Sequence, residues 1–130
     1  MGDLIQRLIA AIFRQEGMPA DHTNPGNLRA APWLKGTPYG VIIPMQGGFW
    51  LPPTRQQGVA GAAHVVSLHI AEGNTLRQLI SIWAPPTDNN NTEAYIANVK
   101  NWAAIEDENV PLWTYIGIDQ YSPSGKTVTG

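Results

Sequence analysis

Hydrophobic positions recur at helical spacing in four stretches of the chain, and a long segment rich in proline and glycine separates the first stretch from the rest. Asp3 precedes the first stretch as a candidate N-cap, and Gly17 and Pro19 follow it as stop signals. The pattern predicts a helix over residues 4–16. Its wide apolar stripe consists of Leu4, Ile5, Leu8, Ile9, Ile12 and Phe13.

Three more helices are predicted in the second half of the chain. Thr54 begins T-R-Q-Q and Thr75 begins T-L-R-Q, and both are capping-box patterns that mark the start of a helix. Asn91 or Thr92 can cap the last helix, and Ala84-Pro85-Pro86 ends the middle one. The expected buried positions are Val59, Ala62, Ala63, Val66 and Ile70, then Leu76, Leu79, Ile80 and Trp83, then Tyr95, Ile96, Val99 and Trp102.

Residues 18–53 form the proline- and glycine-rich segment, which favours turns over helices. Two short apolar runs remain in it, Tyr39 to Ile43 and Phe49 to Leu51, and Gln46-Gly47-Gly48 between them can close a β-hairpin. The expected fold class is therefore α+β and mostly helical, with a small β-hairpin lobe. We expect a single domain over residues 1–116 and a polar C-terminal tail over residues 117–130.

Composition and charge argue against several classes of function. With 130 residues, a net charge of −2 and 14 % charged residues, the chain has no basic stripe for phosphates, so no nucleic-acid partner is expected. No apolar run approaches the ~18 residues of a membrane span, and no signal peptide is visible. Cysteine is absent, and His22, His64 and His69 lack metal-ligand spacing, so no metal or other cofactor is expected. Nothing in the pattern predicts an oligomeric state.

Glu16 breaks the apolar pattern of the first helix. At ~100° per residue it lies within about 60° of Ile5, Ile9, Ile12 and Phe13 around the helix axis, so it shares their face. Burial and the helix C-terminus both disfavour a carboxylate there and raise its pKa. A carboxyl group that stays protonated near neutral pH is suited to general acid catalysis on a glycosidic oxygen.

An unremarkable role for Glu16 stays open at this point. A glutamate in the last turn of a helix can swing into water, or it can accept a salt bridge from Arg29 or Lys35.

The sequence Asn24-Pro25-Gly26-Asn27 follows the first helix closely. Pro25 and Gly26 fit the central positions of a type II turn, which would present Asn24 and Asn27 from a rigid frame. Asparagine side chains both donate and accept hydrogen bonds, which suits sugar hydroxyl and acetamido groups. An ordinary Asx-type turn without a ligand is the alternative.

Aromatic side chains add candidate sugar contacts. Trp33, Tyr39 and Trp50 fall in the irregular lobe, where each can stack on a sugar ring or anchor the lobe to the helices. Trp83 and Trp102 lie on helical apolar stripes and are expected in the core.

The amide-rich stretch 85–93 supplies further candidates. Asp88 and Glu93 are the carboxylates that can partner Glu16, although a solvated loop before a capped helix explains the same composition. Tyr95 can place its hydroxyl in a cleft or pack in the core.

Four short motifs follow one another along the chain: A-I-F-R-Q-E-G at 11–17, T-N-P-G-N-L at 23–28, G-F-W-L-P-P-T at 48–54, and W-A-P-P-T-D-N at 83–89 with Tyr95. In this order they resemble the lysozyme-like superfamily, in its bacterial and phage peptidoglycan-cleaving branch of lytic transglycosylase, endolysin and glucosaminidase-like domains. The first motif resembles the end of the family's catalytic helix, and the second resembles its N-N-P-G-N-L element. The third resembles its strand before a helix, and the fourth resembles its A-P-P…A-Y element.

The resemblance implies a helical lobe and a β-containing lobe around a sugar-binding cleft. It implies that Glu16 is the general acid, that Tyr95 lies in the cleft, and that Asn27 and Thr54 lie near it. The expected partner is a peptidoglycan glycan strand, cleaved at β-1,4 bonds by hydrolysis or by lytic transglycosylation. The expected place of action is the cell wall.

A second class of function is kept beside this one. A lysozyme-like fold can also serve as a non-catalytic glycan-binding or virion structural module, because a fold does not fix a function. The absence of an assured second carboxylate favours that alternative, with Asp88 as the candidate for the position.

Overall fold

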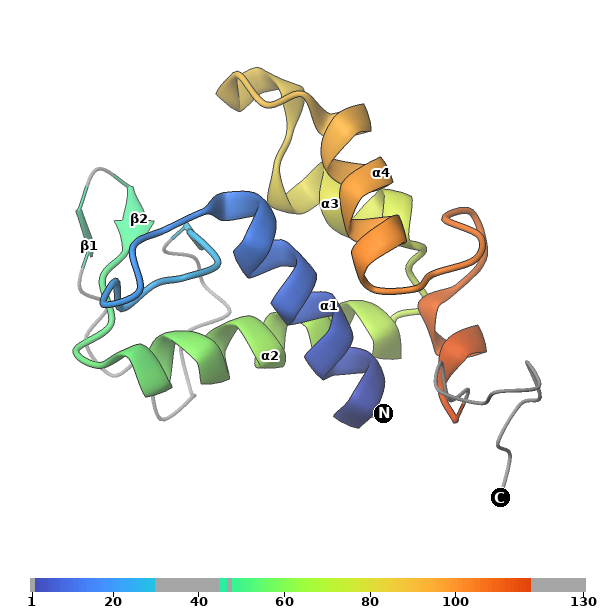
Figure 1. The fold of residues 1–130 in the computed structure, drawn as a ribbon, viewed down its shortest axis with the longest axis horizontal. Coiled ribbons are helices and arrows are strands. Elements are labelled where there is room, and N and C mark those ends of the chain that lie inside the picture. The colour runs from blue at the N-terminus through green and yellow to red at the C-terminus, as the bar shows by residue number, and fades with distance from the viewer. Residues whose placement is uncertain (1, 30–44, 47, 118–130) are drawn as a thin grey trace.

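The computed structural model describes residues 2–29, 45, 46 and 48–117, and within these residues the chain is mostly helical with one small hairpin (Figure 1). The helices are α1 (Gly2–Glu16), α2 (Arg55–Ala71), α3 (Leu76–Trp83) and α4 (Thr92–Trp102). The strands are β1 (Met45–Gln46) and β2 (Phe49–Trp50), and two short 3₁₀ helices are η2 (Pro86–Asp88) and η3 (Leu112–Tyr115). The mostly helical α+β prediction is confirmed at this level.

Helix α1 packs against both α2 and α4. Four residues of the predicted stripe are fully buried, Ile5 and Phe13 are partly buried, and Arg7 and Ala11 are buried in addition. The helix begins at Gly2, so the prediction of Asp3 as N-cap is wrong. Asp3 lies in the first turn, where its carboxylate pairs with Arg7 four residues on, as helix geometry allows. Arg7 also donates from Nε to the Ala103 carbonyl at 3.0 Å, which ties α1 to the end of α4.

The stop signal after α1 acts as expected. Gly17 has a φ of +63°, which a glycine adopts without strain, and its N–H donates to the Phe13 carbonyl at 3.0 Å. The chain therefore leaves the helix immediately after Glu16, and that side chain lies at the end of the element.

The hairpin is confirmed, with a different first strand. Met45 pairs with Trp50 and Gln46 with Phe49, so Gln46 belongs to a strand although it was expected in the turn. Gly48 has a φ of +83°, the kind of backbone a tight turn needs. The predicted run from Tyr39 to Ile43 lies outside the described residues.

Trp50 anchors the hairpin to α2. Its side chain is 1 % exposed, and a Cβ atom at Gly61 would lie only 2.3 Å from its Cζ3. The indole ring therefore occupies the space that any other residue at position 61 would fill. Of the two roles predicted for Trp50, anchoring is the one that the structure shows, and sugar stacking is excluded by burial.

The three later helices start where the sequence predicts. Thr54 accepts from the Gln57 N–H at 3.2 Å, Thr75 forms a complete capping box with Gln78, and Asn91 caps α4 by accepting from Ala94. The buried residues of α3 and α4 include the predicted Leu76, Leu79, Ile80, Tyr95, Ile96 and Val99. In α2, Gly58 and Gly61 join Ala62, Val66 and Ile70 on the buried face.

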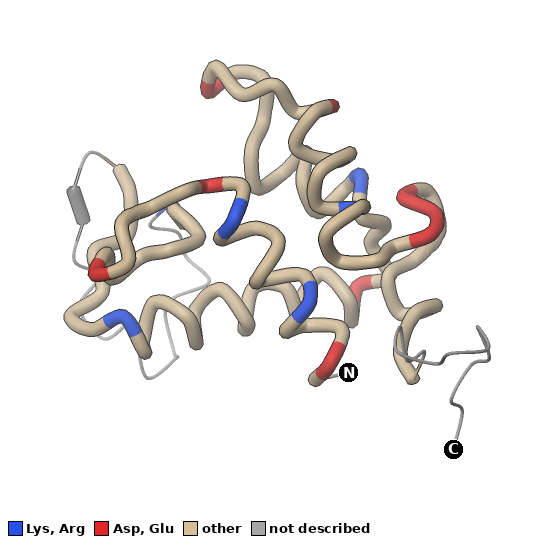
Figure 2. The backbone as a smooth tube through the Cα atoms, viewed as in Figure 1, with Lys and Arg blue, Asp and Glu red and all other residues tan. Residues whose placement is uncertain are grey.

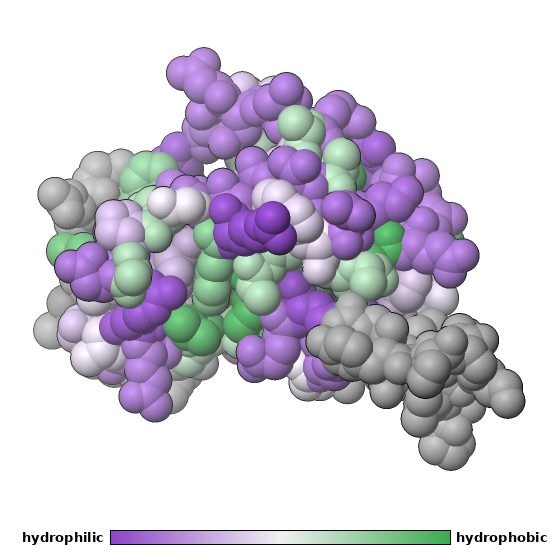
Figure 3. Space-filling view, viewed as in Figure 1, coloured by the Kyte–Doolittle hydropathy of each residue, from purple (hydrophilic) through white to green (hydrophobic). Residues whose placement is uncertain are grey.

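Charged residues are few in the described part of the chain, and they are scattered along the backbone (Figure 2). Polar residues cover much of one face, while apolar side chains show between α1 and α2 (Figure 3). No helix within the described residues has the length and apolarity that crossing a membrane requires. The predicted tail lies, apart from Gly117, outside the described residues.

Candidate active site

Glu16 lies in a cavity of about 330 Å³ where separate parts of the chain meet. The end of α1 contributes Glu16, the segment after it contributes Asn27 and Arg29, and β2 contributes Phe49. The opposite wall comes from the end of α3 and from η2 with the residues after it, namely Trp83, Ala84, Thr87, Asp88, Asn89 and Asn90. Hydrogen-bonding side chains and two aromatic rings thus surround one carboxyl group.

The Glu16 carboxyl group is held by two neighbours. Tyr95 donates from its hydroxyl to Oε2 at 2.7 Å, and the Asn27 side chain makes a second hydrogen bond. Burial raises the pKa of Glu16 above its ordinary value, and it outweighs these two hydrogen bonds, which act in the opposite direction. The carboxyl group therefore keeps its proton to a higher pH than an exposed glutamate does.

Tyr95 is positioned by α4, which packs against α1. Its side chain is 3 % exposed, and burial together with the neighbouring Glu16 raises the pKa of its hydroxyl far above the ordinary value. The hydroxyl stays protonated and acts as a donor to Glu16. Of the two predicted places for Tyr95, the structure shows the core. The residue does not line the cavity, and its hydroxyl is bonded to Glu16.

Asn24 and Asn27 have different roles. Asn24 is 1 % exposed, and its amide donates to the carbonyls of Leu28 and Trp50 at 3.0 and 2.8 Å while accepting from the Leu28 N–H at 3.0 Å. It holds the loop to β2 and does not line the cavity, so its prediction as a sugar contact is wrong in this structure. Asn27 does line the cavity, with a φ of +51°.

The predicted type II turn is also wrong. Gly26 does not have the positive φ that this turn requires at its third residue, and the positive value falls on Asn27. Glycine is needed at position 26 for a packing reason, since a Cβ atom there would lie 2.9 Å from Cζ2 of Trp83. The Trp83 Nε1–H donates to the Gly26 carbonyl at 2.8 Å, which joins the loop to α3.

Asp88 lines the same cavity as Glu16 and is part of an ion pair. Its Oδ2 accepts from the Arg29 guanidinium at 2.9 Å and from Arg29 Nε at 3.2 Å. The same guanidinium lies over the Phe49 ring, 4.6 Å from its centre. The alternative salt bridge from Arg29 to Glu16 is not formed, because Arg29 pairs with Asp88.

The remaining candidates lie away from the cavity. The Glu93 carboxylate is exposed and pairs with Arg77 at 2.6 Å, outside the cavity lining. The Thr54 hydroxyl caps α2 and does not line the cavity either. Trp33, Lys35 and Tyr39 lie outside the described residues. Trp102, expected in the core, is half-buried, with the Arg14 guanidinium 4.1 Å from its ring centre.

Arg29 is a wall residue that the sequence does not predict. Its position depends on the bridge between its backbone and Phe49 of β2, a contact between residues distant in sequence. Trp83 was assigned to the core alone, yet it also lines the cavity. Within the described residues, no group of three or more acidic or histidine side chains is arranged to hold a metal ion.

Comparison with protein-family models, with curated proteins and with solved structures finds no match for this chain. The resemblance to the lysozyme-like superfamily therefore stays a prediction from its motifs. What the cavity can do chemically follows from its own residues. It holds one proton donor of raised pKa, amide groups suited to sugar hydroxyls, and aromatic surfaces suited to sugar rings.

Proposed function

We propose that this protein cleaves β-1,4 glycosidic bonds in the glycan strands of peptidoglycan, with Glu16 as the general acid. The observation that carries the proposal is the Glu16 carboxyl group, half-buried, raised in pKa, and held by Tyr95 and Asn27 inside an open cavity. The order of the four family-like motifs gives the substrate class. A lysozyme-like arrangement of the helices and the hairpin is part of the same proposal.

In the proposed reaction Glu16 gives its proton to the glycosidic oxygen as the bond between that oxygen and the anomeric carbon breaks. The hydroxyl of Tyr95 and the amide of Asn27 then stabilise the carboxylate that remains, because both are hydrogen bonds that favour the charged form. If water attacks the anomeric carbon, the product has a reducing end. If the 6-hydroxyl of the same sugar attacks that carbon instead, the product is a 1,6-anhydro sugar. Asp88 is the candidate second carboxylate in the hydrolytic case.

The test is release of soluble fragments from purified cell walls, followed by turbidity and by mass spectrometry of the products. We expect Glu16→Gln to lower the rate about 100-fold or more, since general acid catalysis contributes 10²–10⁴-fold. Glu93→Gln is the matched control, because it removes an exposed carboxylate outside the cavity. Equal rates for the wild type and Glu16→Gln would remove Glu16 from the mechanism.

The ion pair between Arg29 and Asp88 favours a second candidate, a non-catalytic glycan-binding or virion structural module. Because Oδ2 of Asp88 already accepts two hydrogen bonds from Arg29, this carboxylate is not a free base for activating water. A binding module would retain cell walls in a pull-down but release no soluble fragments, even after long incubation. An active protein would release fragments whose mass distinguishes reducing from anhydro ends.

A further inference from the structure

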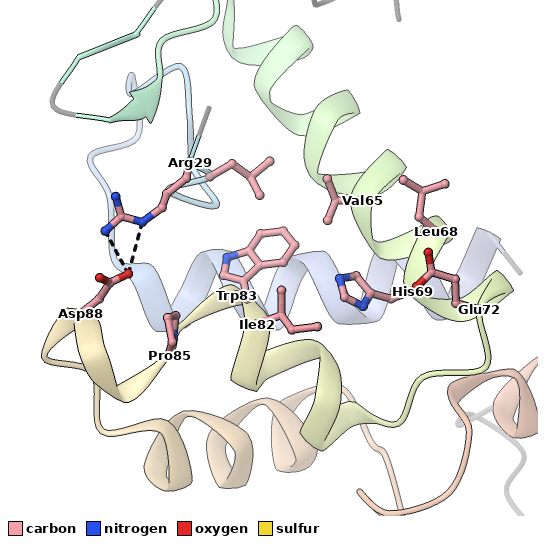
Figure 4. Close-up of a pocket in the computed structure, with 10 residues that line it drawn as sticks. Arg29, Val65, Leu68, His69, Glu72, Ile82, Trp83, Pro85 and Asp88 are labelled. Carbon is pink, nitrogen blue, oxygen red and sulfur yellow. Dashed lines mark hydrogen bonds and ion pairs between the residues drawn. The ribbon is translucent and has the colours of Figure 1, made fainter. Parts of the chain in front are cut away.

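A second cavity, of about 340 Å³, shares lining residues with the one that holds Glu16. Figure 4 shows the side chains that line this second cavity. Its wall is mainly apolar and consists of Leu28, Val65, Leu68, Ile82, Trp83 and Pro85. Figure 4 shows Arg29 and Asp88 at one end of it and His69 with Glu72 at the other. The cavity is thus apolar along its length and charged or polar at both ends.

The two cavities are adjacent. Arg29, Trp83 and Asp88 line both of them, so the ion pair and the indole ring form the boundary that they share. A substituent on a sugar bound beside Glu16 is therefore separated from the second cavity by these three side chains alone.

The apolar wall is exposed to an unusual degree. Ile82 is 65 % exposed and Leu68 is 39 % exposed, although both side chains are large and hydrophobic. Neighbouring exposed apolar side chains rimmed by polar groups mark a binding surface more often than chance exposure does. A ligand that covers them gains roughly 25 cal/mol for each Å² of apolar surface removed from water.

The polar ends add constraints on the ligand. The Asn74 amide nitrogen lies 2.8 Å from Nδ1 of His69 and can only donate, so a neutral His69 carries its proton on Nε2. At the opposite end the Arg29 guanidinium is half-exposed and offers donors to a carboxylate. Glu72 and Asp88 offer acceptors for an ammonium group.

We propose that the second cavity binds the peptide that peptidoglycan strands carry, so that the preferred substrate is a peptide-bearing strand. This inference rests on the proposed function. The stem peptide branches from the glycan, contains the methyl groups of alanine, and ends in carboxylate and ammonium groups. Those features match an apolar trough with a guanidinium at one end and acceptors at both.

The test compares two substrates of equal glycan length. One is purified glycan strands with their peptides, and the other is the same strands after an amidase has removed the peptides. We expect the wild type to have a kcat/KM about tenfold higher on the peptide-bearing strands, which corresponds to about 1.4 kcal/mol. Ile82→Ser should bring the two values close together. Ile116→Ser, which alters an exposed apolar side chain outside the cavity, should keep the preference.

A binding measurement keeps the two proposals separable. The probe is the free tetrapeptide L-alanyl-γ-D-glutamyl-diaminopimelyl-D-alanine, titrated against the methyl NMR signals of Leu68 and Ile82. Shifts of these signals on adding the tetrapeptide support the peptide site. If the protein shows these shifts but cleaves neither substrate, only the proposed function is overturned. Equal kcat/KM on both substrates, or methyl signals that move with peptide-free glycan and not with the tetrapeptide, would overturn the peptide site.

Discussion

The proton on Glu16 links the stability of the fold to pH. Because burial raises the pKa of this carboxyl in the folded state, its protonated form contributes stability that is fully present below the unfolded value of about 4.3. That stability is lost as the pH rises through the folded pKa. At neutral pH the buried Glu16 carboxyl group therefore lowers the stability of the fold locally.

The first prediction follows from that cost. Glu16→Gln keeps the shape of the side chain and can still accept from Tyr95, but it has no charge to desolvate. We expect a higher melting temperature than the wild type at pH 8, and a difference that shrinks toward zero at pH 4. Thermal unfolding across this range measures it. A wild type that is more stable than the variant at pH 8 would contradict the burial argument.

Tyr95→Phe tests the hydrogen bond to Glu16. This bond lowers the pKa of Glu16, so its loss should raise that pKa further and move the alkaline limb of the pH–activity profile to higher pH. The free energy of unfolding should fall by about 1 kcal/mol, the usual worth of one hydrogen bond. Tyr115→Phe is the control, because its hydroxyl bonds to the Asp107 backbone. An alkaline limb at the same pH in both proteins would mean that Tyr95 does not affect the pKa of the catalytic acid.

Among the helices, α3 depends most visibly on its cap. It has eight residues, and Thr75 with Gln78 forms a reciprocal capping box at its start. We expect Thr75→Ala to lower the free energy of unfolding by about 1 kcal/mol, and Thr75→Ser to lower it by much less. Urea unfolding monitored by circular dichroism provides the measurement. Similar losses in both variants would indicate that the hydroxyl is not the stabilising group.

The contact between α2 and the hairpin predicts a larger loss of stability for a single substitution. In Gly61→Ala the new Cβ would lie 2.3 Å from Trp50 Cζ3, so the ring or the helix has to move. We expect the free energy of unfolding to fall by about 1–3 kcal/mol or more, as in other overpacked cores. Gly2→Ala is the control, since a Cβ there meets nothing within 4 Å. Equal stability of the two variants in urea would mean that the hairpin is not seated on α2.

The helices and their caps could be predicted because each depends on residues within a few positions of one another. Gly26 could not be interpreted in this way. The dipeptide Pro25-Gly26 suggests a type II turn, but glycine is needed there because the Trp83 ring, 57 residues away in sequence, leaves no room for a Cβ atom. The role of Asn24 could not be predicted for the same reason, because its hydrogen-bond partner Trp50 is distant in sequence. Glu16 can be singled out from the sequence, because a carboxylate on an apolar stripe is visible without any tertiary information.

At the scale of the whole molecule, the Arg29–Asp88 ion pair joins the loop beside the hairpin to the segment after α3. Both side chains are partly exposed, so the pair should contribute less than about 1 kcal/mol to folding. We expect Asp88→Asn to leave urea unfolding nearly unchanged. A fall in cell-wall cleavage of 100-fold or more in this stable variant would assign Asp88 a chemical role, whereas retained activity would leave the substrate's own hydroxyl or acetamido group as the nucleophile.

Glu16 and the hydroxyl that holds it are 79 residues apart in sequence, on helices α1 and α4, which pack against each other. The turn after α2 separates them, because Glu16 precedes it and Tyr95 follows it. A protein cut in that turn would therefore form this hydrogen bond only when its two fragments bind each other. Under the proposed function, cell-wall cleavage by the mixed fragments would report their correct assembly with no added label.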